Sequence, residues 1–375
     1  MIPKESRPIL LPEFAEREAT TKGYLDTMSI SDSVAPLTVS EAGESEVLAR
    51  ILKALSRETT SGAQHVLVGP GDDSAVLALA GDCVVSSDSM VDKHDFRLDW
   101  STGFELGWKL AATNLADVAA MGATPLSLTV SVLAPGELPV SVLEEVALGL
   151  STACDTLAPG CQVTGGDLAS AAQFSLVATV IGETRELTPV LRSGARAGDT
   201  VAYAGELGVA ARGLSLLYAT TDSQDAQSRA ISELWLSHPD EMAAQLAPSP
   251  PISLGPLAAR AGATAMMDVS DSLSLDASRL AKASNVDINL RSDAILNCTS
   301  QEAETVSKQA RAEALSFALG GGEDHGFLAT FPPGASLPKG FTPIGDASPG
   351  GGALRVDGVV FEPRGWDALK HRSIV

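Results

Sequence analysis

Apolar positions along this chain recur with two different periods, and each change of period predicts a change of secondary structure. Helical spacing is clear in LTVSEAGESEVLARILKALSRE, in STGFELGWKLAATNLADVAAMG (101–122) and in VSVLEEVALGLSTACDTL, so these three segments predict helices. Ser101 or Thr102 can cap the start of the second of them, and Gly122 can end it. Shorter apolar runs between glycine, proline and polar residues predict the strands HVLV, SAVLAL, DCVVSS, PLSLTVSVLAP, CQVTGG and FSLVATVIGE.

The second half of the chain restarts this alternation at RSGARAGDTVAYAGELG (192–208). ATAMMDVS predicts a strand leading into the helix DSLSLDASRLAKAS, ALSFALGGGEDHGFLATF a glycine-rich turn before another strand, and GGALRVDGVVFEP a closing hairpin. We interpret the proline-rich APSPPISLGP (247–256) as a surface connection. Because strands and helices alternate in both halves, the pattern predicts an α/β (α+β) fold built in layers.

Length and composition favour a two-domain globular enzyme. The 375 residues are 45% hydrophobic and 19% charged, which is ordinary for such a protein. We place the domain boundary within Glu183–Pro189. We therefore expect a mobile N-terminal tail over residues 1–38, an N-terminal domain over 39–186 and a C-terminal domain over 187–375.

The net charge limits the classes of binding partner that we expect, and the cysteine spacing indicates the cellular compartment. A formal net charge of -21 leaves no spare basic surface, which argues against nucleic acid and anionic membranes as partners. No apolar run reaches the length of a membrane span. The cysteines form no C-x-x-C pair, so we expect neither a disulfide framework nor a zinc site, and the pattern predicts the reducing cytoplasm. They are Cys83, Cys154, Cys161 and Cys298.

Carboxylates recur where predicted strands end, each time beside small residues that let the backbone approach a ligand closely. Oxygen ligands, without histidine or cysteine at metal spacing, suit Mg²⁺. Each motif alone also fits a turn or a helix cap, but the recurrence of one arrangement favours a metal site. The carboxylates are those of Asp72, Asp73, Asp88, Asp167, Asp268, Asp271, Glu323 and Asp324.

Asp117 differs because it lies inside a predicted helix, on the same apolar stripe as Leu106 and Leu110. An inward-facing charge is costly unless a partner offsets it. One partner we consider is Lys109, although a span of two helical turns is long.

The usual phosphate-binding motif is absent: no G-x-x-x-x-G-K-[ST] occurs, and the dipeptide Gly-Lys appears nowhere. If the protein handles a nucleotide, metal ions must neutralise most of the phosphate charge. Arg192 is the direct cation that we expect, and the helix start at DVSD offers free backbone N–H groups.

Seven motifs occur in order between about Glu44 and Trp366: GPGDDSAVL, VVSSDSMV, KLAATNLADVAAMGATP, VTGGD, LRSGARAGD, MMDVSDSL and LGGGEDHGFL. Together they resemble the thiamine-monophosphate kinase family, within the aminoimidazole ribonucleotide synthetase superfamily. The resemblance implies the two-domain aminoimidazole ribonucleotide synthetase-like (PurM-like) architecture, each domain a mixed sheet with helices packed on it. It also implies a homodimer formed through the N-terminal domain.

The activity that this resemblance implies is transfer of a phosphoryl group from ATP to thiamine monophosphate, giving thiamine diphosphate. We expect direct Mg²⁺-assisted transfer, because a phosphate acceptor is already anionic and needs little general base. The implied metal ligands are Asp73, Ser86, Ser87, Asp88, Asp117, Asp167, Asp268 and Asp271. The implied ATP contacts are Gly166, Asp167, Arg192 and Ser270, and the implied thiamine contacts are Glu323, Trp366, His94 and Asp95. Among these, we expect Asp117, Asp271 and Arg192 to carry catalysis.

Three positions depart from the family pattern. Asp95 stands where the family has a histidine, with His94 beside it, so either side chain can face the acceptor. Ser272 replaces a glycine, which is unfavourable if the backbone needs positive φ and acceptable in the first turn of a helix. Ala116 replaces a serine beside Asp117.

Other functions remain open at this point. One is a different ATP-using enzyme of the same superfamily, acting on another small phosphorylated or carbonyl acceptor. A selenophosphate synthetase-like enzyme is disfavoured, because no cysteine precedes Cys83. A magnesium-dependent phosphohydrolase and a non-catalytic cation-binding module are the remaining alternatives.

Overall fold

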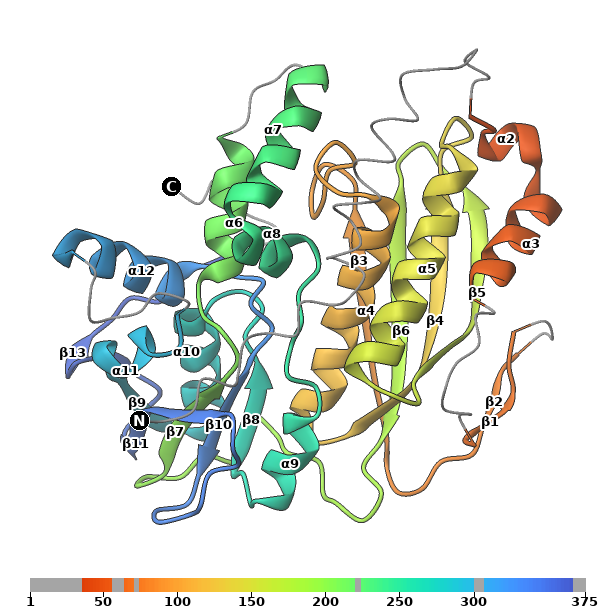
Figure 1. Cartoon of the computed structure of the whole chain (residues 1–375). Coiled ribbons are helices and arrows are strands. Elements are labelled where there is room, and N and C mark those ends of the chain that lie inside the picture. The colour runs from red at the N-terminus through yellow and green to blue at the C-terminus, as the bar shows by residue number, and fades with distance from the viewer. Residues whose placement is uncertain (1–35, 56–63, 71–73, 220–223, 300–306, 367–375) are drawn as a thin grey trace, which may run out of the picture. The chain divides into compact units, whose positions relative to one another are not determined.

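Two mixed sheets carry the fold, and the first is built between residues 83 and 183 (Figure 1). The computed structural model describes residues 36–55, 64–70, 74–219, 224–299 and 307–366. In the first sheet the strand order is β3–β6–β4–β5, with β4 and β5 parallel and the other neighbours antiparallel. Its strands are β3 (Cys83–Val91), β4 (Thr124–Ala134), β5 (Gln162–Ser170) and β6 (Ser175–Glu183).

One face of this four-stranded sheet is covered by α4 (Gly103–Ala120) and α5 (Val140–Leu157), which pack on each other and on the strands. Figure 1 shows both helices in front of the sheet. Side chains on the opposite face stay open: in β3 the residues Cys83, Val85, Ser87 and Ser89 are exposed, alternating with more buried neighbours. Val85 is 58% exposed.

The second sheet has seven strands in the order β13–β12–β9–β11–β7–β10–β8, with β12 and β9 parallel and the other neighbours antiparallel. Its strands are β7 (Thr200–Ala204), β8 (Ala265–Asp268), β9 (Val286–Leu290), β10 (Phe327–Phe331), β11 (Phe341–Pro349), β12 (Leu354–Val356) and β13 (Val359–Val360). The helices α10 (Leu273–Ser284), α11 (Ser292–Leu296) and α12 (Lys308–Gly320) pack on the strands and on one another. Tyr203, Ile288 and Leu328 lie in the core between these layers.

Helix α4 is buried along nearly its whole length. It contacts the first sheet and α5, and also β8, α8 (Pro239–Leu246) and α9 (Leu254–Arg260). Thr102 caps its start as the sequence predicts: the Thr102 hydroxyl accepts from the Glu105 amide, and the Glu105 carboxylate accepts from the Thr102 amide. Gly122 follows its end with φ +76°, a conformation that favours glycine.

Helices α4 and α5 touch backbone to backbone. A Cβ atom on Gly107 would lie 2.0 Å from the Val146 carbonyl oxygen, and one on Gly149 would lie 2.0 Å from the Phe104 carbonyl oxygen. Only glycine permits this approach, which fixes α4 against its neighbour.

The remaining elements flank these layers. The helix predicted near the N-terminus is interrupted at Gly43, whose φ is +73°, and forms two helices. The predicted strands HVLV and SAVLAL are present and pair antiparallel. Helices α6 and α7 follow β7 in the chain, and the apolar pattern did not predict them. These elements are α2 (Val39–Ala42), α3 (Glu44–Leu55), β1 (Val66–Val68), β2 (Val76–Leu77), α6 (Val209–Tyr218) and α7 (Gln224–Ser237).

The interpretation of residues 247–256 as a surface connection is wrong. Ala247, Pro248 and Ile252 are buried, and the indole Nε1 of Trp108 donates a 2.7 Å hydrogen bond to the Pro248 carbonyl. The segment therefore packs against α4. Its Pro248 carbonyl supplies the hydrogen-bond acceptor that the fully buried indole of Trp108 requires.

The predicted α/β (α+β) class with mixed sheets is confirmed, and the closing hairpin is the β12–β13 pair. Thr38–Val375 form one compact unit. The domain boundary near residue 186 stays a prediction. In the part of the chain that the structure describes, no helix combines the length and the apolar character needed to cross a membrane.

Candidate active site

Three carboxylates from distant parts of the sequence converge between the two sheets. Asp88 belongs to β3, Asp117 to the last turn of α4, and Asp268 is the final residue of β8. Burial raises the pKa of Asp117 to about 7, and the negative charges of Asp268 and Asp88 contribute to this rise. Burial also raises the pKa of Asp88, and the charge of Asp268 again acts in the same direction. The three groups therefore form one electrostatic cluster.

Ser86 joins the cluster from the same strand as Asp88. Because successive side chains of a strand point to opposite faces, Ser86 and Asp88 share the face covered by α4. The Ser86 hydroxyl donates a 2.6 Å hydrogen bond to Oδ2 of Asp117. This bond ties the carboxylate of α4 to β3.

Ser87 and Asp167 lie on the open face of the same sheet. The Ser87 hydroxyl donates to the Ala178 carbonyl at 2.9 Å, and Asp167 is exposed on β5 opposite Ser131 of β4. Gly166 aligns with Asp88 across the sheet, through Ala178 and Val130 on the two strands between them. A Cβ atom on Gly166 would lie 2.1 Å from the Val130 carbonyl oxygen. The sheet thus separates the residues predicted as metal ligands into two groups.

The expectation that these carboxylates follow strand ends is correct for Asp268 and wrong for Asp88 and Asp167, which lie inside β3 and β5. Both of these strands are at an edge of the four-stranded sheet. An edge strand pairs on one side only and tolerates serine, glycine and aspartate, so their polar segments continue the strand instead of ending it.

The glycine-rich segment before β10 adopts an unusual backbone. Glu323 has φ +66° and His325 has φ +51°, which are uncommon for residues other than glycine. The Glu323 amide donates to the Ser270 carbonyl at 2.7 Å, and the His325 amide donates to the Val269 carbonyl at 2.9 Å. These bonds hold the segment beside the loop that carries Asp268 and Asp271. Left-handed residues of this kind cluster at functional sites.

Glu323 is the centre of a second charged group. Its Oε1 lies 2.8 Å from the Nζ of Lys109, which is buried on α4, and its Oε2 accepts a hydrogen bond from Nε2 of Gln245 on α8. Burial acts to raise the pKa of Glu323, but Lys109, Gln245 and His325 together outweigh it, so the pKa is below its ordinary value. The Lys109–Asp117 pairing considered from the sequence is thus replaced by a Lys109–Glu323 pair.

His325 and Asp324 complete the glycine-rich segment. His325 Nδ1 is 3.5 Å from Oδ2 of Asp268. Burial acts to lower the pKa of His325, but Asp268 and Glu323 together raise it above its ordinary value. Asp324 accepts hydrogen bonds from the amides of Gly208 and Ala210 at the start of α6. Burial nevertheless raises the pKa of Asp324 to about 7.

Asp271 and Trp366 meet at the start of α10. The Trp366 amide donates to the Asp271 carbonyl at 3.0 Å, and the Asp271 carboxylate lies 2.5 Å from the guanidinium of Arg279. Ser270, next in the chain to Asp271, is half-buried, whereas the Arg192 side chain is exposed. Trp366 itself is half-buried.

His94 and Asp95, which the resemblance implies as contacts of the acceptor, lie in the turn after β3. Asp95 accepts a 2.9 Å hydrogen bond from the Val91 amide through Oδ2, which closes the turn, and His94 is exposed. Asp73 and its neighbour Asp72 lie outside the described residues.

The contacts of three residues in this region, His325, Lys109 and Gln245, were not predicted from the sequence. His325 lies within a motif that was recognised, so a histidine beside Glu-Asp was an available signal. Lys109 was visible as a charge in an apolar helix, but its partner was not. Gln245 gave no signal, because α8 itself was not predicted.

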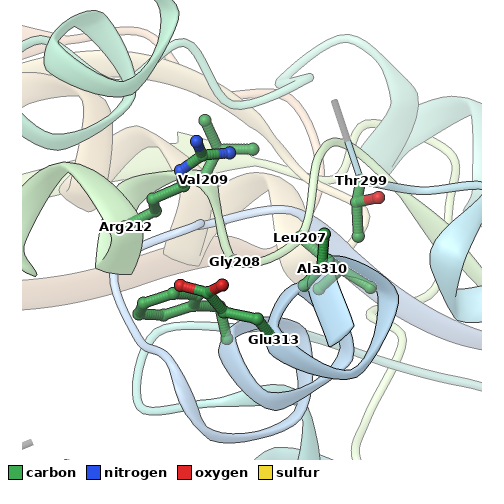
Figure 2. A pocket seen from close by; sticks show the side chains of 9 residues that line it. Leu207, Gly208, Val209, Arg212, Thr299, Ala310 and Glu313 are labelled. Atoms are coloured by element: carbon green, nitrogen blue, oxygen red, sulfur yellow. The ribbon is translucent and has the colours of Figure 1, made fainter. Parts of the chain in front are cut away.

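A cavity of about 140 Å³ opens elsewhere, between the start of α6 and α12 (Figure 2). Arg212 and Glu313 line it together with apolar residues such as Leu207 and Phe317. It contains none of the residues predicted for the site, so it does not explain their arrangement.

The carboxylate cluster fits a hard divalent cation. Mutual repulsion and burial raise the pKa of Asp117, and a bound cation would relieve both effects. Over the described ranges, no three carboxylate, imidazole or thiol groups form a site able to hold a metal ion on their own. Mg²⁺ does not require such a cage, because it usually keeps water ligands and shares phosphate oxygens.

The segment that carries the first sheet, Asp88 and Asp117 matches the class of AIR synthase related proteins. Residues 71–184 match the sequence model of the family described as AIR synthase related protein, N-terminal domain. Within this class, the chain belongs to the thiamine-monophosphate kinase family. It is 36% identical over 324 residues to the thiamine-monophosphate kinase of Mycobacterium tuberculosis (strain ATCC 25618 / H37Rv), covering 86% of this chain and 90% of that one.

Solved structures agree with this assignment. The thiamine monophosphate kinase from Aquifex aeolicus is 28% identical with a TM-score of 0.61, covering 75% of this chain and 90% of that one. The structure of AaThiL complexed with AMPPCP and TMP is 26% identical with a TM-score of 0.62, covering 90% of this chain and 99% of that one. The fold and the family predicted from the ordered motifs are confirmed.

Proposed function

We propose that this protein transfers the γ-phosphoryl group of ATP to the phosphate of thiamine monophosphate, giving thiamine diphosphate and ADP. Membership of the family supports the substrates, since one structurally similar protein is complexed with AMPPCP and TMP. The observation that carries the proposal is the convergence of Asp88, Asp117 and Asp268, with the pKa of Asp117 raised to about 7.

Asp88, Asp117 and Asp268 would hold Mg²⁺, with Asp73, Ser86 and Asp271 as further ligands. When bound, the metal supplies positive charge that offsets the charge of the substrate phosphates. The protein itself has a net charge of -21 and offers little positive charge for this purpose. An oxygen of the acceptor phosphate attacks the γ-phosphorus, and the bond between this phosphorus and the oxygen bridging to ADP breaks. Stereochemistry at an isotopically chiral γ-phosphate tests this single step: inversion is expected, and net retention would exclude it.

Residues outside the carboxylate cluster have separate proposed roles. Gly166, Arg192 and Ser270 contact ATP in this scheme. Ser87 and Asp167 lie on the opposite face of the sheet from Asp88 and Asp117, so their roles as metal ligands, and that of Asp167 as an ATP contact, stay predictions from the resemblance. Glu323 and Trp366 bind the thiamine part of the acceptor, with His94 or Asp95 beside it. Lys109 and Gln245 support the proposed role of Glu323, because they hold its carboxylate ionised and fixed.

We also propose that two copies associate through the open face of the four-stranded sheet. Val85 is 58% exposed there, and the strand register places it beside Ile181. Val85 and Ile181 form an apolar area on this face that the described elements leave partly exposed, and oligomerisation buries surfaces of this kind. A cytoplasmic location stays a prediction from the cysteines. All four cysteines lie in the described residues and are free thiols.

A single assay tests the activity. Purified protein is incubated with ATP, Mg²⁺ and thiamine monophosphate, and both ADP and thiamine diphosphate are measured. The proposal requires ADP release that depends on thiamine monophosphate and matches thiamine diphosphate formation. ADP release without this dependence would favour hydrolysis or another acceptor of the same superfamily. No release under any of these conditions would favour a cation-binding role.

A further inference from the structure

The start of α10 and the last described segment of the chain are joined by two buried hydroxyl groups. Ser272 is the N-cap of α10 and is completely buried; its Oγ accepts from the Leu275 amide at 3.1 Å. The same Oγ donates to the Arg364 carbonyl at 2.6 Å. Ser274 Oγ donates to this carbonyl as well, at 2.8 Å, and accepts from the Arg364 amide at 3.1 Å.

Neighbouring contacts extend this attachment toward Trp366. A Cβ atom on Gly365 would lie 2.5 Å from both the Asp271 carbonyl oxygen and Ser272 Oγ, so the two backbones pass in direct contact. The Trp366 amide donates to the Asp271 carbonyl at 3.0 Å. Because these bonds lie on consecutive residues, the position of Trp366 depends on how Arg364 is held.

Serine at position 272 involves no backbone strain. Its φ of 163° is an extended conformation that any residue adopts, which answers the question raised by the glycine of the family pattern. A glycine at this position would have no hydroxyl to donate to Arg364. In this chain the side chain therefore adds an attachment that the backbone alone does not provide.

We propose that Ser272 is a positioning residue for Trp366 and so sets the affinity for the aromatic acceptor. This inference rests on the proposed function, in which Trp366 contacts the thiamine part of the acceptor. A half-buried tryptophan next to the Asp268–Asp271 loop offers a flat ring face for stacking on an aromatic ligand. Stacking requires the ring to be held in one place, and the Ser272–Arg364 bond anchors the segment two residues before it.

The experiment compares three variants of the full-length chain: Ser272→Ala, Ser272→Gly and the control Ser278→Ala. Ser278 is buried on the same helix, six residues further on, and is 3% exposed. Loss of one hydrogen bond corresponds to roughly a fivefold change in an equilibrium. We expect both Ser272 variants to raise the KM for thiamine monophosphate roughly fivefold while the KM for ATP and kcat stay within about twofold, and Ser278→Ala to change none of these.

Hydrogen exchange measured by mass spectrometry gives a second readout that needs no activity. The Trp366 amide should exchange roughly fivefold faster in both Ser272 variants than in the wild-type chain, and at the wild-type rate in Ser278→Ala. Unchanged exchange at Trp366, or an equal rise of both KM values, would overturn the positioning role. If the wild-type chain shows no thiamine-dependent turnover, the proposed function fails, and the exchange experiment still decides whether Ser272 holds Trp366.

Discussion

The Nζ of Lys109 lies 2.8 Å from Oε1 of Glu323, so helix α4 is joined to the glycine-rich segment before β10 by an ion pair. The lysine side chain is 7% exposed and that of the glutamate 31%, which places the pair largely out of water. Removing one member of a buried pair leaves the other charge without compensation, and this is more damaging than losing the pair as a whole.

Lys109→Met should therefore lower both stability and acceptor affinity. We expect the free energy of unfolding to fall by about 3 kcal/mol, as for other broken buried pairs. Without Lys109, burial would dominate and raise the pKa of Glu323, so the KM for thiamine monophosphate should rise and should improve again as the pH increases. Urea denaturation and KM values measured across pH check both statements.

Two further variants serve as controls for this pair. Lys109→Arg keeps the charge and should recover part of the loss. Arg260→Met removes one member of the exposed Arg260–Glu186 pair and should change stability by less than about 0.5 kcal/mol. Equal stability of Lys109→Met and the wild-type chain would show that the ion pair contributes nothing.

Asp117→Asn should abolish turnover with little effect on the fold. The amide has nearly the same shape and can still accept from Ser86, but it removes the charge that Mg²⁺ would bind. We expect kcat to fall at least about a thousandfold, with a melting temperature equal to or above that of the wild type at pH 7, because repulsion from Asp88 and Asp268 is reduced. A variant with near-normal kcat would remove Asp117 from the metal site.

Asp324 should make the protein less stable as the pH rises toward neutrality. Its pKa is about 7 in the folded chain and near 3.8 when unfolded, so between these values the folded state binds the extra proton. Stability is then lost as the pH rises from about 4 to about 7, and the contribution amounts to about 2 kcal/mol between pH 5 and pH 7. Asp324→Asn should flatten this dependence in urea titrations at several pH values, whereas exposed Asp293→Asn should not. Parallel curves for all three chains would contradict the assignment.

Val85→Asp should disrupt the proposed dimer. A charge on the open sheet face opposes burial against a second copy, whereas Val359→Asp, at an exposed position on β13, should leave association intact. Sedimentation velocity should show twice the chain mass for the wild type and Val359→Asp, and one chain mass for Val85→Asp. A wild-type chain that sediments as a monomer would end this part of the proposal.

The sequence predicted α3, α4, α5, α10 and most strands correctly because their patterns are local. Helix α4 has a strong apolar pattern, with Thr102 and Gly122 marking its two ends. The elements that were not identified include α6 to α8, α11, α12, β9 and β11. Residues 247–256 were interpreted as exposed. Their burial depends on long-range contacts, such as the Trp108 indole bonded to the Pro248 carbonyl, which no local pattern contains.

The chemistry of the site was easier to predict than its geometry. Carboxylates at Asp88, Asp117 and Asp268 stood out because charges are unusual beside buried apolar segments, and the structure brings these three together. The strand alternation that turns Ser87 away from Ser86 appears only once β3 is known to continue through both residues. The partner of Lys109 could not be inferred, since Glu323 lies more than two hundred positions away in the chain.

Helix α4 carries both Lys109 and Asp117, eight residues apart, which corresponds to about 12 Å along the axis. Its backbone is locked against α5 at Gly107 and Gly149, so a sliding movement would drive main chain into main chain. The helix thus fixes the distance between Asp117, which we propose as a metal ligand, and Lys109, whose partner Glu323 we propose as a contact of the acceptor. Inserting a single residue between Lys109 and Asp117 would rotate one side chain by about 100° around the helix axis relative to the other. No rotamer change at Asp117 could restore the original separation of the two groups.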